Sequence, residues 1–141
     1  MPKQHLAGLL WPQIGSRQAL DSLYKVCAYI GGLERKGIPL HLLSSNGEIQ
    51  LDCRAIDCDL FRFDDLYKER DSIEICHALL ELYAGPLLHT QGYDWLAPWE
   101  ARYELRYAEI LTRLLSHYEQ AGDTLRAGVF RKNLMLLNGH A

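Results

Sequence analysis

Apolar side chains recur at spacings of three and four residues along most of this chain, a period that predicts amphipathic helices around a shared core. The clearest example is the segment 98–121, in which Tyr103, Ile110 and Leu114 fall on one stripe. The same period predicts further helices over residues 17–36, 59–70, 73–84 and 124–138. The pattern therefore indicates a mainly α fold.

Capping residues mark the ends of these predicted helices. Side-chain oxygens suited to an N-cap stand at the expected starts, at Ser16, Asp59, Ser72 and Asp123. Glycines stand at the expected ends, at Gly37, Gly85 and Gly122. Pro98 falls at the first position of its helix, where a missing N–H is harmless. The pair Gly31-Gly32 costs about 1 kcal/mol per glycine relative to alanine, so the first helix is expected to bend or end early there.

One segment departs from the helical period. Apolar residues alternate with polar ones on both sides of Asn46-Gly47, at positions 40 and 42 and again at 49 and 51. Asn-Gly suits the two positive-φ positions of a type I′ turn, so the segment predicts a β-hairpin. A two-stranded ribbon is marginal by itself in water, and its apolar face is expected to lie against a helix or another strand.

The last two predicted helices, within residues 98–138, form an antiparallel helical hairpin with a turn of about three residues. Such a hairpin is the repeating unit of an α-solenoid, and solenoids bury their faces only when neighbouring units stack. The sequence contains no second detectable copy of this period.

Composition suits one globular domain or two small ones: the chain has 141 residues, of which 48% are hydrophobic and 23% charged. Its apolar runs are too short to cross a membrane, and we expect a cytoplasmic protein. The four cysteines stand at 27, 53, 58 and 76 without a Cys-x-x-Cys pair, so buried thiols are favoured over disulfides or a metal centre. No cofactor is expected.

Charge is unevenly distributed along the chain. Residues 1–54 hold six Lys and Arg against four Asp and Glu, whereas residues 55–141 hold nine against fourteen. A nucleic-acid-binding face would therefore lie in the first third. Its net charge of about +2 is far from the strongly basic balance usual in DNA-binding domains.

Motifs that would indicate an enzyme are missing from the sequence. It has no phosphate-binding glycine loop, no Gly-x-Ser-x-Gly and no His-Glu-x-x-His. The carboxylates at 57, 59, 64 and 65 could indicate a cation site, but Asp is also an ordinary residue at a helix start, and capping is favoured. We therefore expect no catalytic activity.

Aromatic residues gather around one loop and the helix that follows it. The set comprises Tyr93, Trp95, Trp99, Tyr103 and Tyr107. These side chains could line a ligand groove, although aromatic clusters at helical spacing more often belong to a core. We interpret four of them, Tyr93, Trp95, Trp99 and Tyr103, as an interaction and packing group, and Tyr93-Asp94-Trp95 in particular as a packing latch between helices.

The order of helix, short link and β-hairpin resembles the recognition helix and wing of a winged helix-turn-helix. The alternative is that the hairpin only covers one end of a helical core. Two stretches favour a family resemblance: "LLWPQIGSRQALDSLYKV" near the start, and "ALLELYAGPLL" with "YDWLAPWEARYELRYAEILTRLLSHYEQAGD" later. They are similar to antibiotic-regulatory-type transcriptional activators and to the bacterial transcriptional activation domain attached to their DNA-binding domain.

This resemblance covers nearly the whole chain and implies two domains. Residues 1–54 would be the C-terminal part of a winged-helix DNA-binding domain, and residues 55–141 would be tetratricopeptide-like helices that mediate interaction or oligomerisation. The family includes response regulators that carry a receiver domain. The implied function is a transcriptional regulator fragment that binds promoter DNA.

Two departures from the family stand out. Its recognition helix usually carries arginines around the positions that Tyr24, Tyr29, Gly31 and Gly32 hold here, and the hairpin tip has no Lys or Arg. Phosphate contacts supply most non-specific affinity, so any DNA binding is expected to be weak. The family also places a sheet and at least one more helix before the recognition helix, and the sequence predicts neither.

Two functional hypotheses remain open at this point. In the first, Arg17, Gln18, Ser22, Lys25 and Tyr29 contact DNA from the helix face opposite the apolar stripe, with Gln18 as a base reader. In the second, the chain is a protein-interaction or oligomerisation module that has lost DNA binding. An uncovered stripe of Leu20, Leu23, Cys27 and Ile30 then predicts a homodimer or an obligate protein partner.

Overall fold

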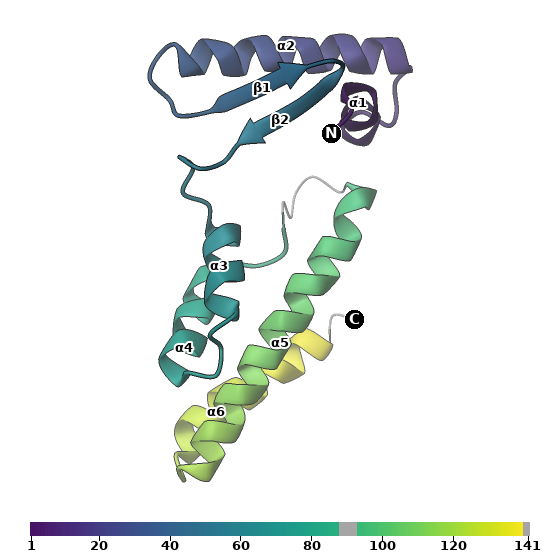
Figure 1. The fold of residues 1–141 in the computed structure, drawn as a ribbon. Helices are drawn as coiled ribbons and strands as arrows, with labels where there is room; N and C mark the ends of the chain where they lie inside the picture. The colour runs from purple at the N-terminus through teal and green to yellow at the C-terminus, as the bar shows by residue number, and fades with distance from the viewer. Residues whose placement is uncertain (88–92, 140–141) are drawn as a thin grey trace. The chain divides into compact units, whose positions relative to one another are not determined.

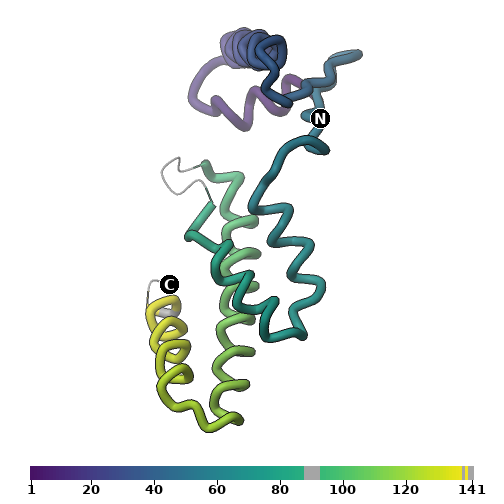
Figure 2. Tube along the Cα trace, turned by 90° about the vertical axis from the view of Figure 1, so that its left-hand side faces the viewer, coloured from purple at the N-terminus to yellow at the C-terminus, as the bar shows by residue number. Residues whose placement is uncertain are grey.

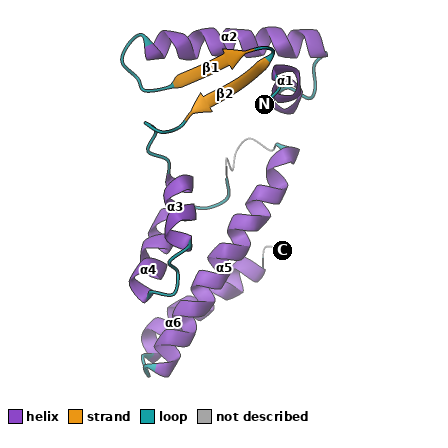
Figure 3. Ribbon diagram, in the orientation of Figure 1, coloured by secondary structure: helices purple, strands orange, loops and turns teal. Residues whose placement is uncertain are grey.

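The computed structural model describes residues 1–87 and 93–139, and it confirms a mainly helical protein with a small antiparallel sheet (Figures 1 and 3). The described part of the chain holds six α-helices, one short 3₁₀ helix and two strands. The chain divides into two compact units, unit 1 at Met1–Asp57 and unit 2 at Cys58–Ala141. The sequence analysis places the domain boundary between residues 54 and 55.

Unit 1 is built on two packed helices, α1 (Lys3–Leu10) and α2 (Ser16–Glu34). Alanines face each other where the helices meet, and Ala7 and Ala19 are each only 1% exposed. Small side chains let two helix backbones approach closely, which buries Leu23 beside them. Around this centre pack the partly buried side chains of Leu6, Leu10, Trp11, Leu20 and Cys27.

Helix α1 corrects the sequence analysis, which predicts no helix before the segment 17–36. Only eight residues long, α1 is too short to be stable alone, so its existence depends on burial against α2. It also covers the apolar stripe that was expected to be exposed: Leu23 is 2% exposed, and Leu20 and Cys27 are half-buried. Ile30, the fourth residue of the stripe, is half-buried but is not among the side chains of this cluster.

The β-hairpin forms as predicted, from β1 (His41–Ser45) and β2 (Glu48–Asp52). Asn46 and Gly47 have φ values of 47° and 78°, the two positive angles that a type I′ turn requires. Ile49 is the buried residue of the hairpin. The chain start lies beside β2: the amide N–H of Ile49 donates a 2.8 Å hydrogen bond to the carbonyl of Met1, and Pro2 bridges Glu48.

Unit 2 consists of four α-helices, with a 3₁₀ turn η1 (Asp94–Leu96) before the third. The helices are α3 (Asp59–Tyr67), α4 (Ile73–Leu82), α5 (Ala97–Gln120) and α6 (Thr124–Asn138). Each packs on its neighbour in sequence, and α5 and α6 lie side by side in both ribbon and tube views (Figures 1 and 2). The core of unit 2 comprises Phe63, Cys76, Leu79, Tyr103, Ile110, Leu111, Leu114 and Phe130.

Helix ends agree with the sequence at some positions and differ at others. Ser72 and Asp123 are N-caps as predicted, since their side chains accept hydrogen bonds from the amides of Ile75 and Arg126. The predictions for Ser16 and Asp59 were wrong, because both stand one position inside their helices, after Gly15 and Cys58.

Three further boundaries differ from the sequence-based prediction. Pro98 is the second residue of α5, because the helix begins at Ala97. Helix α3 ends at Tyr67, a turn before the expected end near residue 70. Helix α2 continues through Gly31-Gly32 to Glu34, so the local cost of the two glycines does not end it early.

Candidate functional site

The outward face of α2 carries the residues predicted to contact DNA. The apolar side chains of Ala19 and Leu23 turn toward α1, and the helix period places Arg17, Gln18 and Lys25 on the opposite side, where all three are exposed. Tyr29, one turn after Lys25, is 69% exposed. Ser22 is half-buried and lies nearer the edge of this face.

The basic residues on this face are accompanied by an acidic one, which reduces the positive potential of the face. Asp21 is exposed one turn from both Arg17 and Lys25, so its carboxylate lowers the positive potential between them. Lys3 of α1 adds a positive charge close to α2. Its ammonium group lies 5.5 Å from the ring centroid of Tyr24. Sequence analysis missed Lys3, since the contact depends on α1 packing against α2.

The β-hairpin that follows α2 adds no cation at its turn. Its tip is Ser44, Ser45, Asn46, Gly47 and Glu48. Arg54, just after β2, is held by Asp52 through a 2.6 Å ion pair, and this pairing lowers the pKa of Asp52 to about 2. The hairpin tip therefore offers backbone groups, hydroxyl groups and the carboxylate of Glu48 to a ligand, but no cation.

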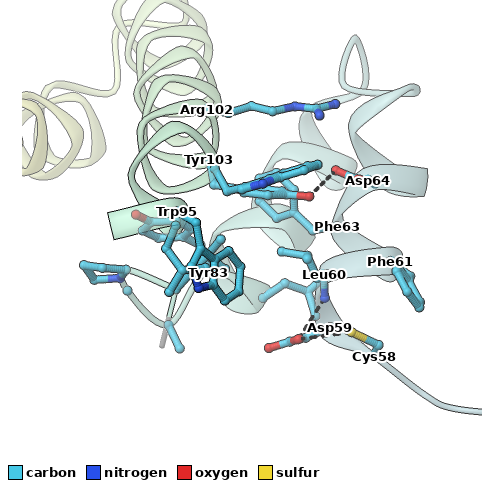
Figure 4. A pocket seen from close by; sticks show the side chains of 17 residues that line it. Cys58, Asp59, Leu60, Phe61, Phe63, Asp64, Tyr83, Trp95, Arg102 and Tyr103 are labelled. Atoms are coloured by element: carbon cyan, nitrogen blue, oxygen red, sulfur yellow. Dashed lines mark hydrogen bonds between the residues drawn. The ribbon is translucent and has the colours of Figure 1, made fainter. Parts of the chain in front are cut away.

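A second candidate site is a pocket of about 840 Å³ in unit 2, formed by α3, the end of α4, η1 and the first turns of α5 (Figure 4). Three of the four residues predicted as an interaction and packing group line it: Trp95, Trp99 and Tyr103. Tyr93, the fourth, stacks on Trp95 with ring centroids 5.5 Å apart. Other walls come from Leu60, Phe61, Phe63, Tyr83, Pro86 and Leu87.

The phenols in the pocket wall are neutral groups at physiological pH. Burial raises the pKa of Tyr83, and burial together with a hydrogen bond to Asp64 raises the pKa of Tyr103. The Tyr103 hydroxyl donates a 2.9 Å hydrogen bond to Asp64, as Figure 4 shows. Tyr83 also stacks on Tyr107, with centroids 4.2 Å apart.

Two polar groups of this pocket have no partner within the described residues. The indole N–H of Trp95 is buried and finds no acceptor there. Arg102 lines the pocket at an exposed position, and the described part of the chain gives its guanidinium no ion pair, only the ring of Trp99 at 5.8 Å. The sequence signal for Arg102 is its spacing three residues after Trp99, which puts both side chains on one face of α5.

The pocket carboxylates, in contrast, already have partners. Asp64 accepts hydrogen bonds from Tyr103 and from Arg106. Asp59 accepts a 2.8 Å hydrogen bond from the backbone amide of Leu60. Asp64 is therefore paired with a cation, whereas Asp59 has no ion pair within the described residues.

Comparisons of this chain with protein-family models, with curated proteins and with solved structures give no match. No helix in residues 1–87 or 93–139 has the length and apolar character needed to cross a membrane. Those same residues contain no group of three His, Cys, Asp or Glu side chains suited to a metal ion.

Proposed function

We propose that the chain is a module of a cytoplasmic transcriptional regulator, in which unit 1 binds promoter DNA and unit 2 mediates protein interaction. The observation that carries the proposal is the order of elements in unit 1. Two packed helices joined by the turn 11–15 are followed directly by a hairpin, the arrangement of a helix-turn-helix with a wing. In that arrangement α2 is the recognition helix.

The exposed residues of α2 then take distinct roles. Arg17 and Lys25 bind phosphates through charge, and Lys3 extends this contact from α1. Gln18 is the one side chain of the set that can pair with an adenine edge through two hydrogen bonds. Tyr29 packs its exposed ring against the sugar-phosphate backbone. Ser22, being half-buried, contributes a single hydroxyl contact.

Affinity is expected to be modest and strongly dependent on salt. Three phosphate contacts give a slope of about −2.7 in a plot of log K against log salt, or about 40-fold weaker binding at 200 mM than at 50 mM. Asp21 lies among these cations and reduces their effect. A weak, salt-sensitive interaction therefore distinguishes this site from a strongly basic DNA-binding domain.

The test is fluorescence polarisation with a labelled generic duplex at those two salt concentrations. Lys25→Ala is expected to weaken binding and to reduce the salt slope by about one unit. Lys132→Ala is the matched control, because Lys132 is exposed on α6 in unit 2 and its loss removes the same charge. Binding that is absent, insensitive to salt, or reduced equally by both variants would contradict the proposal.

A second candidate function, protein interaction alone, is favoured by the surface of α6. Four large apolar side chains are exposed along it: Leu125, Val129, Met135 and Leu136. Three of them, at positions 125, 129 and 136, repeat at helical spacing on one face. Consecutive packing of α3 to α6 also suits a tetratricopeptide-like arrangement, in which such a face contacts a further helix.

Light scattering over a wide protein concentration range tests this second candidate. A dimer that dissociates in the double variant Leu125→Ser/Leu136→Ser, with the wild-type circular dichroism spectrum retained, supports an interface on α6. A monomer at every concentration argues against self-association. The homodimer and the obligate partner remain predictions until that measurement.

A further inference from the structure

We propose that the pocket of unit 2 binds a small aromatic carboxylate that carries a second hydrogen-bond acceptor. The pocket volume of about 840 Å³ lies in the range of drug-sized ligand sites, about 300 to 1,000 Å³. Aromatic and aliphatic side chains form most of its wall (Figure 4). This inference does not depend on DNA binding by unit 1.

The charge of the ligand follows from which groups in the pocket are already occupied. Asp64 is neutralised by Arg106 and hydrogen-bonded by Tyr103. Arg102 has no carboxylate partner in the described part of the chain, and in Figure 4 it projects from α5 beside Tyr103. At the Arg102 end of the pocket an anion gains an ion pair without displacing an existing one, and a planar guanidinium matches a carboxylate in two-point geometry.

The second acceptor follows from Trp95. Its indole N–H is buried without a partner among the described residues, and an unmet buried donor is unfavourable. A ligand carbonyl that displaces the atoms covering this N–H and accepts a hydrogen bond from it removes the penalty. The neighbouring rings of Tyr83 and Trp95 then supply flat apolar surface for stacking against the ligand body (Figure 4).

Three related probes separate these contributions. 4-Benzoylbenzoate carries two aromatic rings, a ketone and a carboxylate. Benzophenone lacks the carboxylate, and 4-benzylbenzoate replaces the ketone by a methylene group. In titrations of the full chain followed by ¹H–¹⁵N spectra, 4-benzoylbenzoate is expected to bind saturably and to move one indole resonance downfield. A Trp95→Phe spectrum assigns that resonance to Trp95.

Variants then locate the anion. Arg102→Ala is expected to weaken 4-benzoylbenzoate binding by about tenfold while leaving benzophenone unchanged, because a hydrogen bond to a charged group is the part removed. Arg102→Lys keeps the charge and is expected to recover part of the affinity. 4-Benzylbenzoate is expected to bind without the downfield shift of the Trp95 indole N–H, because it lacks the carbonyl that accepts the hydrogen bond.

Several outcomes would overturn the proposal. One is the absence of saturable shifts from 4-benzoylbenzoate at millimolar concentration. Another is equal weakening of all three probes by Arg102→Ala, which would indicate loss of folding rather than loss of an anion contact. Loss of binding in Leu125→Ser/Leu136→Ser, whose changes lie on α6 outside the pocket lining, would place the probe on that exposed face instead.

Discussion

The side chain of Arg70 donates a hydrogen bond of 2.8 Å from its Nε to Oε1 of Glu109, and so joins the segment after α3 to the middle of α5. The same carboxylate accepts a hydrogen bond from the hydroxyl of Tyr67 and one of 3.1 Å from Nε of Arg113. The Tyr67 hydrogen bond, followed by that from Arg70, lowers the pKa of Glu109 from 4.5 to about 2. One carboxylate thus links three donors across unit 2.

Glu109 makes the stability of unit 2 depend on pH. A carboxyl whose pKa is lower in the folded state stabilises the fold above its unfolded pKa, so this contribution is present above pH 4.5 and declines as the pH falls toward about 2. Thermal unfolding by circular dichroism between pH 7 and pH 2 is expected to show wild type more stable than Glu109→Gln at neutral pH, with the difference shrinking on acidification. Glu69→Gln, at an exposed position, is the control and is expected to follow wild type. A constant gap between wild type and Glu109→Gln would contradict this assignment.

The N-cap of α6 is expected to contribute measurably to stability. Asp123 accepts a 3.0 Å hydrogen bond from the amide of Arg126, so Asp123→Ala is expected to lower the free energy of unfolding by about 1 kcal/mol. Asp123→Ser keeps an acceptor and is expected to recover most of the loss. Ser16→Ala is a matched comparison in unit 1, because Ser16 is the first helical residue of α2 rather than its cap and is expected to change stability little. Urea unfolding measures all three variants.

Two glycines of unit 1 are expected to respond to alanine in opposite directions. Gly47 has a φ of 78°, which costs an alanine about 1 to 2 kcal/mol, so Gly47→Ala is expected to destabilise the hairpin. Gly8 lies in α1 with no atom within 4 Å of an added Cβ, and Gly8→Ala is expected to stabilise by about 0.5 to 1 kcal/mol. Hydrogen exchange at the amide of Ile49 reports both effects. Changes of the same sign in the two variants would be inconsistent with these backbone conformations.

Leucines of unit 2 are expected to differ sharply in their importance for folding. Leu111 is fully buried in the core, so Leu111→Ala is expected to destabilise by about 2 to 5 kcal/mol. Leu125 is 81% exposed on α6, and Leu125→Ala is expected to change stability by less than about 0.5 kcal/mol. Urea unfolding of the two variants at a low and a high protein concentration makes the comparison. A large loss on Leu125→Ala that depends on protein concentration would instead indicate a buried interface there.

Features that depend on nearby residues were determined by the sequence itself. The helical period predicted α2 to α6, Asn46-Gly47 predicted the hairpin turn, and Ser72 and Asp123 predicted two N-caps. Each depends on backbone preferences or on hydrogen bonds within about four residues, which are legible in a single segment. The mainly helical class follows from the same local rules.

Tertiary structure alone decided the features that join distant segments. Helix α1 is stable through the contact of Ala7 with α2, and its own eight residues give no strong helical pattern. The cluster around Glu109 unites residues about 40 positions apart, and the pocket brings Tyr83 and Arg102 together across the segment between α4 and α5. Sequence spacing fixes which face of a helix a side chain occupies, but only packing decides what that face meets, because burial and hydrogen bonding between elements outweigh local preference.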